Sequence, residues 1–198
     1  QQDQITFREE LPTCLSDLDE EASRPLRLFC QDECRIGRMP ILRHTITLPG
    51  VKPIQKAQPA YEYFYVYGAV EPETGQRFFT EHERLNSDGF QDFLDRFARR
   101  FPCSHNVMIL DNGPFHKAKK LAIPENVTLV FLPPYSPELN PVERFWQDLK
   151  DAIGGTFYKY LADLRQQTRT VLSRYTDEAV ASLTGYDYLL EATRVGLS

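Results

Sequence analysis

The chain has 198 residues, of which 41% are hydrophobic and 26% charged, and this composition suits a single soluble domain and excludes a disordered chain. No run approaches the roughly 18 apolar residues that a membrane span needs, and the first residues lack the basic start and apolar stretch of a secretory signal. The net charge is −5. Basic nucleic-acid-binding domains usually have a pI above about 9, so any contact with nucleic acid must rest on a local site.

The negative charge is concentrated at the N-terminal end of the chain. Residues 1–25 hold seven acidic and two basic side chains, whereas the other 173 residues hold 21 of each. We therefore expect residues 1–25 to form an exposed acidic leader. The rest is expected to form a folded core over residues 26–155, with a C-terminal helical extension over residues 156–198 that packs on it.

The first part of the core is predicted to be β-structure, because it contains short runs of apolar, aromatic and β-branched residues. The predicted extended segments are residues 26–31, 41–48, 61–70 and 76–80. The first of these ends at Asp32 and Glu33, and a turn at residues 73–75 joins the last two. In 61–70 a stripe of alternating tyrosines indicates sheet packing, with a base-stacking platform as the alternative.

Strands and helices alternate in the second part. The predicted order is a helix with Ser87 as N-cap, a strand, a short helix, a strand, a Pro-rich loop, a helix and further helices. The boundaries are 87–101 for the first helix, 106–110 and 127–132 for the strands, and 141–152 for the helix after the loop. Hairpin strands followed by alternating strands and helices predict an α/β fold with a mixed sheet covered by helices.

Three acidic residues stand at unusual places in this pattern. Asp32 and Asp111 each follow a buried strand, and Glu143 lies in the first turn of the helix that the Pro-rich loop delivers. Ligands bind at strand ends in open α/β sheets, so the two aspartates would share one crevice if their strands are neighbours. Like charges held so close raise a pKa unless a cation neutralises them, and carboxylate oxygens favour Mg²⁺ or Mn²⁺.

Each acid also has an ordinary structural explanation. Asp111 begins an Asp-Asn-Gly turn signal, and Asp32 with Glu33 could simply end a strand. Asn140, Pro141 and Glu143 also fit a helix start, with Asn as N-cap, Pro at the first position and Glu completing a capping box. The three acids together, with their flanking residues, are harder to explain in this way.

The segments around the acids carry a family resemblance. They read QDECRIG, ILDNGPFHKAKK and LVFLPPYSPELNPVERFWQDLK. Together they resemble the catalytic core of the DDE transposases over residues 25–155, in particular the bacterial insertion-sequence-six-thirty group of the Tc-one–mariner superfamily. The resemblance implies an RNase H-like fold, a mixed five-stranded sheet flanked by helices. It also selects Asp32 rather than Glu33 as the first acid.

This resemblance implies a metal-dependent reaction on DNA. Asp32, Asp111 and Glu143 would hold two Mg²⁺ or Mn²⁺ ions and carry out DNA cleavage and strand transfer in cut-and-paste transposition. The partners would be element ends and a TA target, and a homodimer would act on the nucleoid in a bacterial cytoplasm. Members usually carry N-terminal helix-turn-helix modules, and nothing before residue 26 looks like one, so we expect the catalytic portion alone.

Further residues near the acids are secondary candidates for contacts with DNA or metal ligands. They are Arg35, Arg38, Arg43, Asn112, His116, Lys117, Lys119 and Lys120. Asn112 and His116 belong to a DNxxxH pattern that would orient a metal ligand or a phosphate, and an ordinary hydrogen-bonding role is the alternative for His116. The basic residues would contact backbone phosphates, with a solvated surface as the alternative.

Three aromatic residues near Glu143 are expected to be structural. Phe145 and Trp146 would anchor its helix in the core, and Tyr135 with the neighbouring prolines would fix the path of the loop. Two other functions remain open. One is a different RNase H-like nuclease that cuts RNA–DNA hybrids or branched DNA, and the other is an inactive, domesticated module for DNA binding or oligomerisation.

Overall fold

The computed structural model describes residues 2–38 and 61–196. Its centre is a sheet with the strand order β3–β2–β1–β4–β5. The strands are β1 (Leu26–Gly37), β2 (Tyr63–Val70), β3 (Arg77–His82), β4 (His105–Leu110) and β5 (Val127–Phe131). β2 is antiparallel to both β1 and β3, whereas β4 is parallel to both β1 and β5, so the predicted mixed five-stranded sheet is confirmed. The stretch predicted at 41–48 lies outside the described residues.

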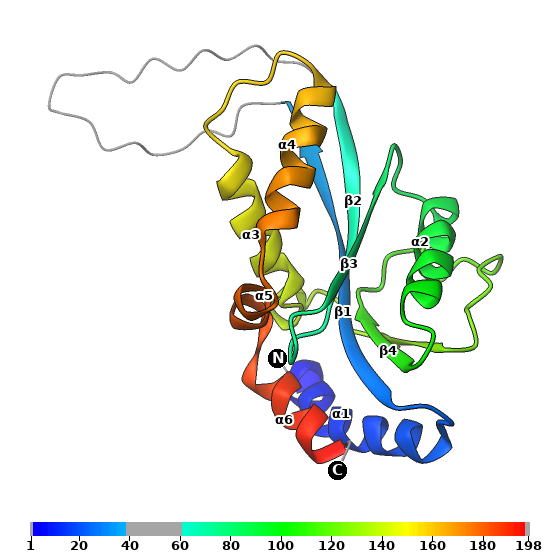
Figure 1. The fold of residues 1–198 in the computed structure, drawn as a ribbon. Helices are drawn as coiled ribbons and strands as arrows, with labels where there is room; N and C mark the ends of the chain where they lie inside the picture. The colour runs from blue at the N-terminus through cyan, green and yellow to red at the C-terminus, as the bar shows by residue number, and fades with distance from the viewer. Residues whose placement is uncertain (1, 39–60, 197–198) are drawn as a thin grey trace, which may run out of the picture.

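Helices cover both faces of this sheet (Figure 1). They are α1 (Gln2–Glu21), α2 (Ser87–Arg100), α3 (Val142–Ile153), α4 (Leu161–Arg174), α5 (Asp177–Thr184) and α6 (Asp187–Gly196). α2 covers one face, while α3 contacts β1 and β2 on the other and is itself covered by α4 and α5. None of the helices in the described ranges is long and apolar enough to cross a membrane.

The helix α2 forms because its phenylalanines recur at helical spacing and face the sheet. Phe90, Phe93 and Phe97 are buried in one apolar cluster with Phe29 of β1. Its N-cap is Asn86 and not the predicted Ser87, because the Asn86 side chain accepts a hydrogen bond from the Gly89 N–H at 2.9 Å. The predicted short helix between β4 and β5 is also wrong, since turns connect these strands.

The strand β1 is longer than predicted, and this changes the setting of Asp32. Only Leu26–Cys30 pair with β4, but the antiparallel partner β2 continues to pair as far as Gly37. The strand therefore does not end at Asp32 and Glu33. Asp32 instead lies just beyond the point where β4 stops, with β2 on one side and an open edge on the other.

The acidic N-terminal segment is not an exposed leader. It forms α1, which packs along α6, and its Leu11 and Leu15 are buried in the apolar cluster on the α3 side of the sheet (Figure 1). The expectation of an exposed segment is wrong because these two leucines, four residues apart, form an apolar face together with Phe7 and Leu18, which pack against the same cluster. The Gln4 side chain also reaches the Pro-rich loop, donating to Ser136 Oγ at 3.1 Å.

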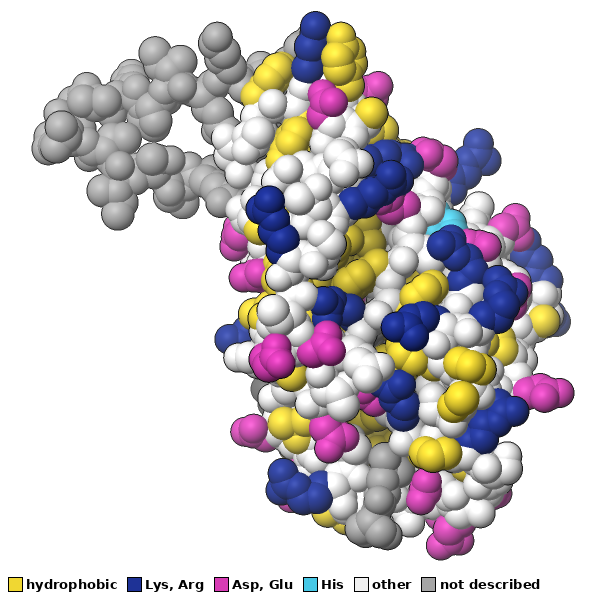
Figure 2. All heavy atoms as spheres, in the orientation of Figure 1, with side chains coloured by type: hydrophobic (Ala, Val, Ile, Leu, Met, Phe, Trp, Pro, Cys, Tyr) yellow, Lys and Arg dark blue, Asp and Glu magenta, His cyan; other side chains and the backbone are white. Residues whose placement is uncertain are grey.

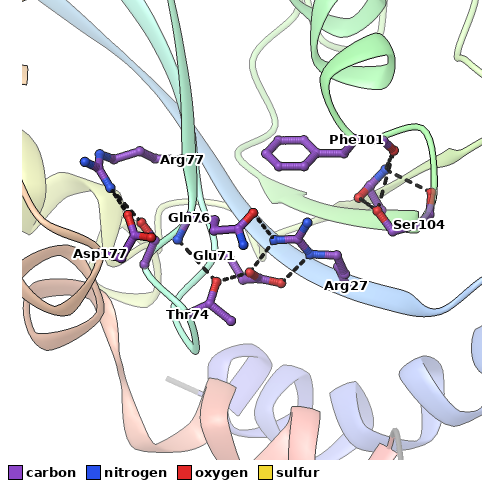
Figure 3. Close-up of polar contacts among 10 residues, drawn as sticks. Arg27, Glu71, Thr74, Gln76, Arg77, Phe101, Ser104 and Asp177 are labelled. Atoms are coloured by element: carbon purple, nitrogen blue, oxygen red, sulfur yellow. Dashed lines mark hydrogen bonds and ion pairs between the residues drawn. The ribbon is translucent and has the colours of Figure 1, made fainter. Parts of the chain in front are cut away.

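Polar contacts join the ends of the antiparallel strands to each other and to α5. Arg27 at the start of β1 forms a bidentate pair with Glu71, at 2.8 and 2.5 Å, and also donates to Gln76 (Figure 3). Arg77 of β3 pairs with Asp177 at the start of α5, at 2.6 Å (Figure 3). On the face drawn in Figure 2, Lys and Arg side chains occur together with Asp and Glu side chains.

Candidate active site

The three predicted acids line one crevice of about 450 Å³. The register of the parallel pair explains why, because Cys30 of β1 pairs with Ile109 of β4. Asp32 and Asp111 each lie two residues further along, so both point to the same face of the sheet. Glu143 enters from the first turn of α3. The other residues of the wall are Asn112, Gly113, Leu132, Pro133, Pro134, Tyr135, Ser136, Pro137 and Asn140.

The ionised form of Asp32 is disfavoured in the metal-free protein. Burial raises the pKa of the Asp32 carboxyl well above its usual range, and the nearby carboxylates of Glu33, Glu143 and Asp111 raise it further. A divalent cation in the crevice would relieve both effects, because it would replace lost solvation and offset the repulsion between the acids. The side chain is thus placed where its ionised form needs a positive partner.

Asp111 is in the opposite situation, because its carboxylate already has partners. Its Oδ1 lies 2.8 Å from His116 Nδ1 and accepts a hydrogen bond from the Gly113 N–H at 2.9 Å. The hydrogen bond from His116 lowers the pKa of the Asp111 carboxyl below its usual range. Asp111 is therefore ionised at neutral pH, while its side chain remains 61% exposed toward the crevice.

His116 connects Asp111 to a second carboxylate that sequence reasoning set aside. Its Nε2 lies 3.0 Å from Glu33 Oε1, and the His116 and Glu33 side chains are only 1% and 7% exposed. Burial lowers the pKa of His116, but the hydrogen bonds to Asp111 and Glu33 outweigh it and raise the pKa to about 9. At neutral pH the ring is an imidazolium that donates to one carboxylate on each side.

Glu33 was missed because the family resemblance selected only one of two adjacent acids. Successive residues of a strand point to opposite faces, so Asp32 faces the crevice while Glu33 faces the α2 side of the sheet. There the His116 ring packs between Phe90 and Phe115, at centroid distances of 4.5 and 4.1 Å. The strand period, combined with the DNxxxH histidine, is the signal that could have found this pair.

Asn140 positions the start of the helix that carries Glu143, and Glu143 itself does not take part in a capping box. The Asn140 side chain donates to the Gln31 carbonyl of β1 at 2.8 Å and accepts from the Val142 N–H at 3.2 Å. The predicted capping box does not form, since the Asn140 N–H donates to the Pro137 carbonyl and Pro141 is the N-cap residue. The start of α3 is thereby tied to the residue next to Asp32.

Close packing between α3 and β2 also fixes this helix. Trp146 is 1% exposed, as expected for an anchor, and it lies over Gly68, the residue that pairs with Asp32 across the sheet. A Cβ atom at Gly68 would lie 2.6 Å from the Trp146 ring and 2.8 Å from Phe79, so only glycine allows this approach. By contrast, Tyr135 is 99% exposed, and the expectation that its side chain fixes the loop is wrong.

Of the secondary candidates, Asn112 and Lys117 belong to the crevice region. Asn112 lines the wall, and its side chain donates to the Leu132 carbonyl and accepts from Lys117. The Lys117 ammonium lies 4.6 Å from the centre of the Phe131 ring of β5. These contacts place a positive charge beside the wall of the crevice.

The structure places the other basic candidates outside the crevice wall. Arg35 stacks on Tyr63 at 3.9 Å, while Arg38 donates to the Tyr158 carbonyl and pairs with Glu62. Lys120 pairs with Asp88 of α2, and Lys119 is exposed. Arg43 lies outside the described residues. The phosphate contacts predicted for these side chains stay predictions.

The chemistry of the donor set fits a divalent metal ion. Three carboxylates face one crevice, and oxygen donors of this kind suit Mg²⁺ and Mn²⁺. Within residues 2–38 and 61–196, however, no three His, Cys, Asp or Glu side chains are grouped tightly enough to form a ready-made metal site. Asp32, Asp111 and Glu143 are thus the residues that would hold such an ion.

Comparison with curated proteins identifies two relatives. The uncharacterized protein y4pE/y4sA of Sinorhizobium fredii is 41% identical over 88 residues, which are 44% of this chain and 65% of the relative. The uncharacterized 39 kDa protein of insertion element IS630 from Shigella sonnei is 28% identical over 139 residues, or 68% of this chain and 40% of the relative. The chain thus spans less than two thirds of the length of either relative.

Solved structures show the same fold at low sequence identity. The catalytic domain of Mos1 mariner transposase superposes with a TM-score of 0.61 at 13% identity, covering 99% of this chain and 95% of the other. The Mos1 transposase paired-end complex with left transposon end gives a TM-score of 0.62 at 16% identity, covering 98% and 62%. These similarities confirm the predicted RNase H-like fold.

The family follows from the sequence itself. Residues 27–165 match the family described as DDE superfamily endonuclease, which is more than half of the chain. This range contains all three acids of the crevice. The predicted resemblance is confirmed, and the chain belongs to the DDE superfamily of endonucleases.

Proposed function

We propose that this chain is the catalytic domain of a transposase that cleaves DNA and transfers its strands with divalent metal ions. One observation carries the proposal: Asp32, Asp111 and Glu143 come from three separate elements and line a single crevice. Asp32 also has its pKa raised by burial and by the neighbouring carboxylates, which is the electrostatic condition that a bound cation would relieve.

The similar structures support DNA and a divalent metal as partners. Mos1 transposase has been solved with a left transposon end, and Mos1 mariner paired-end complexes have been solved with Mn and with Mg. Two bound ions would activate a water or a DNA 3′-hydroxyl and stabilise the leaving oxygen of an in-line displacement. No nucleophilic side chain is needed for this reaction.

The residues of this chain would have distinct tasks. Asp32, Asp111 and Glu143 would hold the ions in the crevice that they line. His116 and the Gly113 N–H hold Asp111 ionised, and Asn140 holds the helix start that carries Glu143 next to β1.

The positive charge beside the crevice suits a phosphate of the DNA backbone. Lys117 is exposed and lies against Asn112 of the wall, so it could approach a phosphate held in the crevice. By the family resemblance we further propose cut-and-paste transposition, a TA target, a homodimer, and action on the nucleoid of a bacterial cell.

A nicking experiment tests the proposal. Supercoiled plasmid, short DNA duplexes and RNA–DNA hybrids are incubated with the protein in Mg²⁺, Mn²⁺ or EDTA, beside the variants Asp111→Ala and Asp17→Ala. Asp17 is an exposed aspartate on α1 and serves as the matched control. We expect nicking that requires metal, is lost in Asp111→Ala and is retained in Asp17→Ala.

The other outcomes separate the alternatives. Cleavage of RNA–DNA hybrids alone would instead indicate a different RNase H-like nuclease. Binding of DNA without cleavage in any metal would indicate an inactive binding or oligomerisation module. Nicking that persists in Asp111→Ala would contradict the assignment of the crevice as the active site.

A further inference from the structure

Tyr135 is the residue of the crevice wall that the structure leaves without a role. Its side chain is 99% exposed, although the next residue, Ser136, is buried. Within the described residues it takes part in no hydrogen bond, ion pair or ring contact of its side chain. Neither packing of the core nor a polar interaction therefore accounts for a large aromatic side chain at this position.

The backbone at Tyr135 adopts a conformation that bulky residues rarely take. Its φ angle is 57°, which lies in the left-handed region. Among the described residues it is the only one other than glycine with a positive φ. Such conformations persist where the surrounding structure enforces them, and they gather at ligand sites.

The loop around Tyr135 is held on both sides, so the ring is presented by a fixed frame. Prolines at 133, 134 and 137 restrict the backbone. Ser136 is buried and donates to the Pro134 carbonyl at 3.2 Å, while Gln4 of α1 donates to Ser136 Oγ. Further along, Asn140 ties the loop to β1.

The chemistry of the crevice indicates what the ring would contact. The carboxylates, with a bound cation, would take a phosphodiester, and Lys117 lies beside them. The group next to a phosphodiester in a DNA strand is a sugar with its base, and an exposed phenol ring offers that base a flat, apolar face. A base that is paired and stacked in a duplex cannot present this face, whereas an unpaired base can.

We propose that Tyr135 is a stacking platform for an unpaired nucleobase next to the phosphodiester held in the crevice. This inference rests on the proposed function and makes it more specific, since the substrate of the site would be DNA that is opened locally. In β2, packing accounts for the tyrosines: Tyr67 is buried, and Tyr63 stacks with Arg35 and contacts Tyr65.

Binding measurements on the full chain test this directly. Affinity is measured in Ca²⁺ for a single-stranded oligonucleotide and for the same strand in a blunt duplex. The variants are Tyr135→Ala, Tyr135→Phe and the control Phe157→Ala, which removes another exposed aromatic ring that does not line the crevice. Tyr135→Trp adds a fluorescence signal, because the one natural tryptophan, Trp146, is buried.

We expect Tyr135→Ala to weaken binding of the single strand by about tenfold, with losses of that order typical for removing a base-stacking aromatic. Tyr135→Phe and Phe157→Ala should bind it like the wild type, and the duplex should bind equally to all variants. The emission of Tyr135→Trp should be quenched by the single strand and not by the duplex. Equal affinity of Tyr135→Ala and wild type for the single strand, or equal losses for both DNAs, would overturn the inference.

Results of the nicking assay show whether a failure concerns the stacking platform or the proposed function. Nicking that requires Asp111, together with no effect of Tyr135→Ala on the single strand, would reject the stacking platform alone. Absence of nicking, together with the stacking signals, would reject the proposed reaction and retain Tyr135 as a DNA-binding residue.

Discussion

The two faces of β1 place adjacent carboxylates in contrasting environments. Asp32 faces the crevice, where burial and the charges of Glu33, Glu143 and Asp111 raise the pKa of its carboxyl. Glu33 faces the other side, where a buried imidazolium lies 3.0 Å from its Oε1. Adjacent positions on a strand thus differ in kind: one acid pairs with a side chain of the protein, while its neighbour faces the crevice, where a bound cation would be its partner.

The two environments are nevertheless coupled. The same His116 ring that pairs with Glu33 also holds Asp111, which returns to the crevice beside Asp32. The buried side therefore orients one of the acids on the exposed side. Substitutions on the two faces of β1 should therefore have different effects on activity and on stability.

Neutralising Asp32 and neutralising Glu33 should change the stability of the metal-free protein in opposite directions. Asp32→Asn should reduce metal-dependent nicking by about a thousandfold or more, because a catalytic metal contributes several kcal/mol. It should also raise the free energy of unfolding of the metal-free protein at pH 7 by about 1 kcal/mol, since it removes a carboxyl whose ionisation is opposed by burial and by the neighbouring carboxylates. Plasmid nicking rates and urea unfolding measure the two effects.

Glu33→Gln is the matched change on the other face. It should lower the free energy of unfolding by about 2 kcal/mol, the usual worth of a hydrogen bond to a charged group. Nicking should fall less than in Asp32→Asn, because Glu33 acts only through His116 and Asp111. If Glu33→Gln stopped nicking and Asp32→Asn did not, the assignment of the two faces would have to be reversed.

The buried imidazolium should make the stability of the metal-free protein depend on pH. The folded-state pKa of His116 is raised to about 9 from an ordinary 6.5, so its stabilisation is complete below pH 6.5 and is lost as the pH rises through 9. The change across this window should be of the order of 3 kcal/mol. Urea unfolding of wild type and His116→Asn between pH 6 and pH 10 measures it.

The variant supplies the reference for this effect. His116→Asn should show a much smaller decline over the same window. Parallel pH profiles of the two proteins would show that His116 does not carry the buried charge.

Packing behind Asp32 should be sensitive to a single methyl group. Gly68→Ala places a Cβ atom 2.6 Å from the Trp146 ring, so α3 must shift, and overpacking of this kind costs about 2 kcal/mol of stability. Nicking should fall as well, because Glu143 moves with the helix. Thermal unfolding and nicking rates provide the two measurements.

Gly155→Ala is the control for this change. It also replaces a glycine near α3, but a Cβ atom there would meet nothing within 4 Å. The residue has a φ of 77°, so the variant should lose only about 1 kcal/mol through backbone strain and should keep its nicking activity. Equal nicking by both variants would indicate that the position of α3 does not matter for the site.

Substitution of Tyr135, which has a positive φ in the wall of the crevice, should cause the smallest change in stability. Tyr135→Gly relieves the positive φ of 57° and removes an exposed ring, so the free energy of unfolding should rise by up to about 1 kcal/mol. A decrease in thermal stability would show that the tyrosine side chain supports the loop after all.

The sequence predicts the sheet well, and it identifies three acids that line one crevice, because both depend on local patterns. The runs at β4 and β5 and the phenylalanine spacing of α2 each determine one element, and the flanks of Asp32, Asp111 and Glu143 carry the family resemblance. The environment of each acid depends on tertiary contacts and could not be predicted. The length of β1 depends on pairing with β2, and the burial of Leu11 depends on α6.

The contact between Glu33 and His116 likewise depends on tertiary structure. It joins residues 83 positions apart, so the strand period and the DNxxxH histidine suggest the two partners but do not establish the contact. The alternation of β1 places Glu33 on the face opposite Asp32, but only the folded turn after β4 brings the ring to it. Likewise, the exposure of Tyr135 is not apparent from a run of prolines that suggests only a rigid loop.

Anomalous scattering from crystals grown with Mn²⁺ would locate the metal and its ligands. We expect anomalous peaks in the crevice, with the carboxylates of Asp32, Asp111 and Glu143 as ligands and with Glu33 still bound to His116. Peaks absent from the crevice at saturating Mn²⁺, or an ion held by Glu33 in place of Asp32, would contradict this expectation.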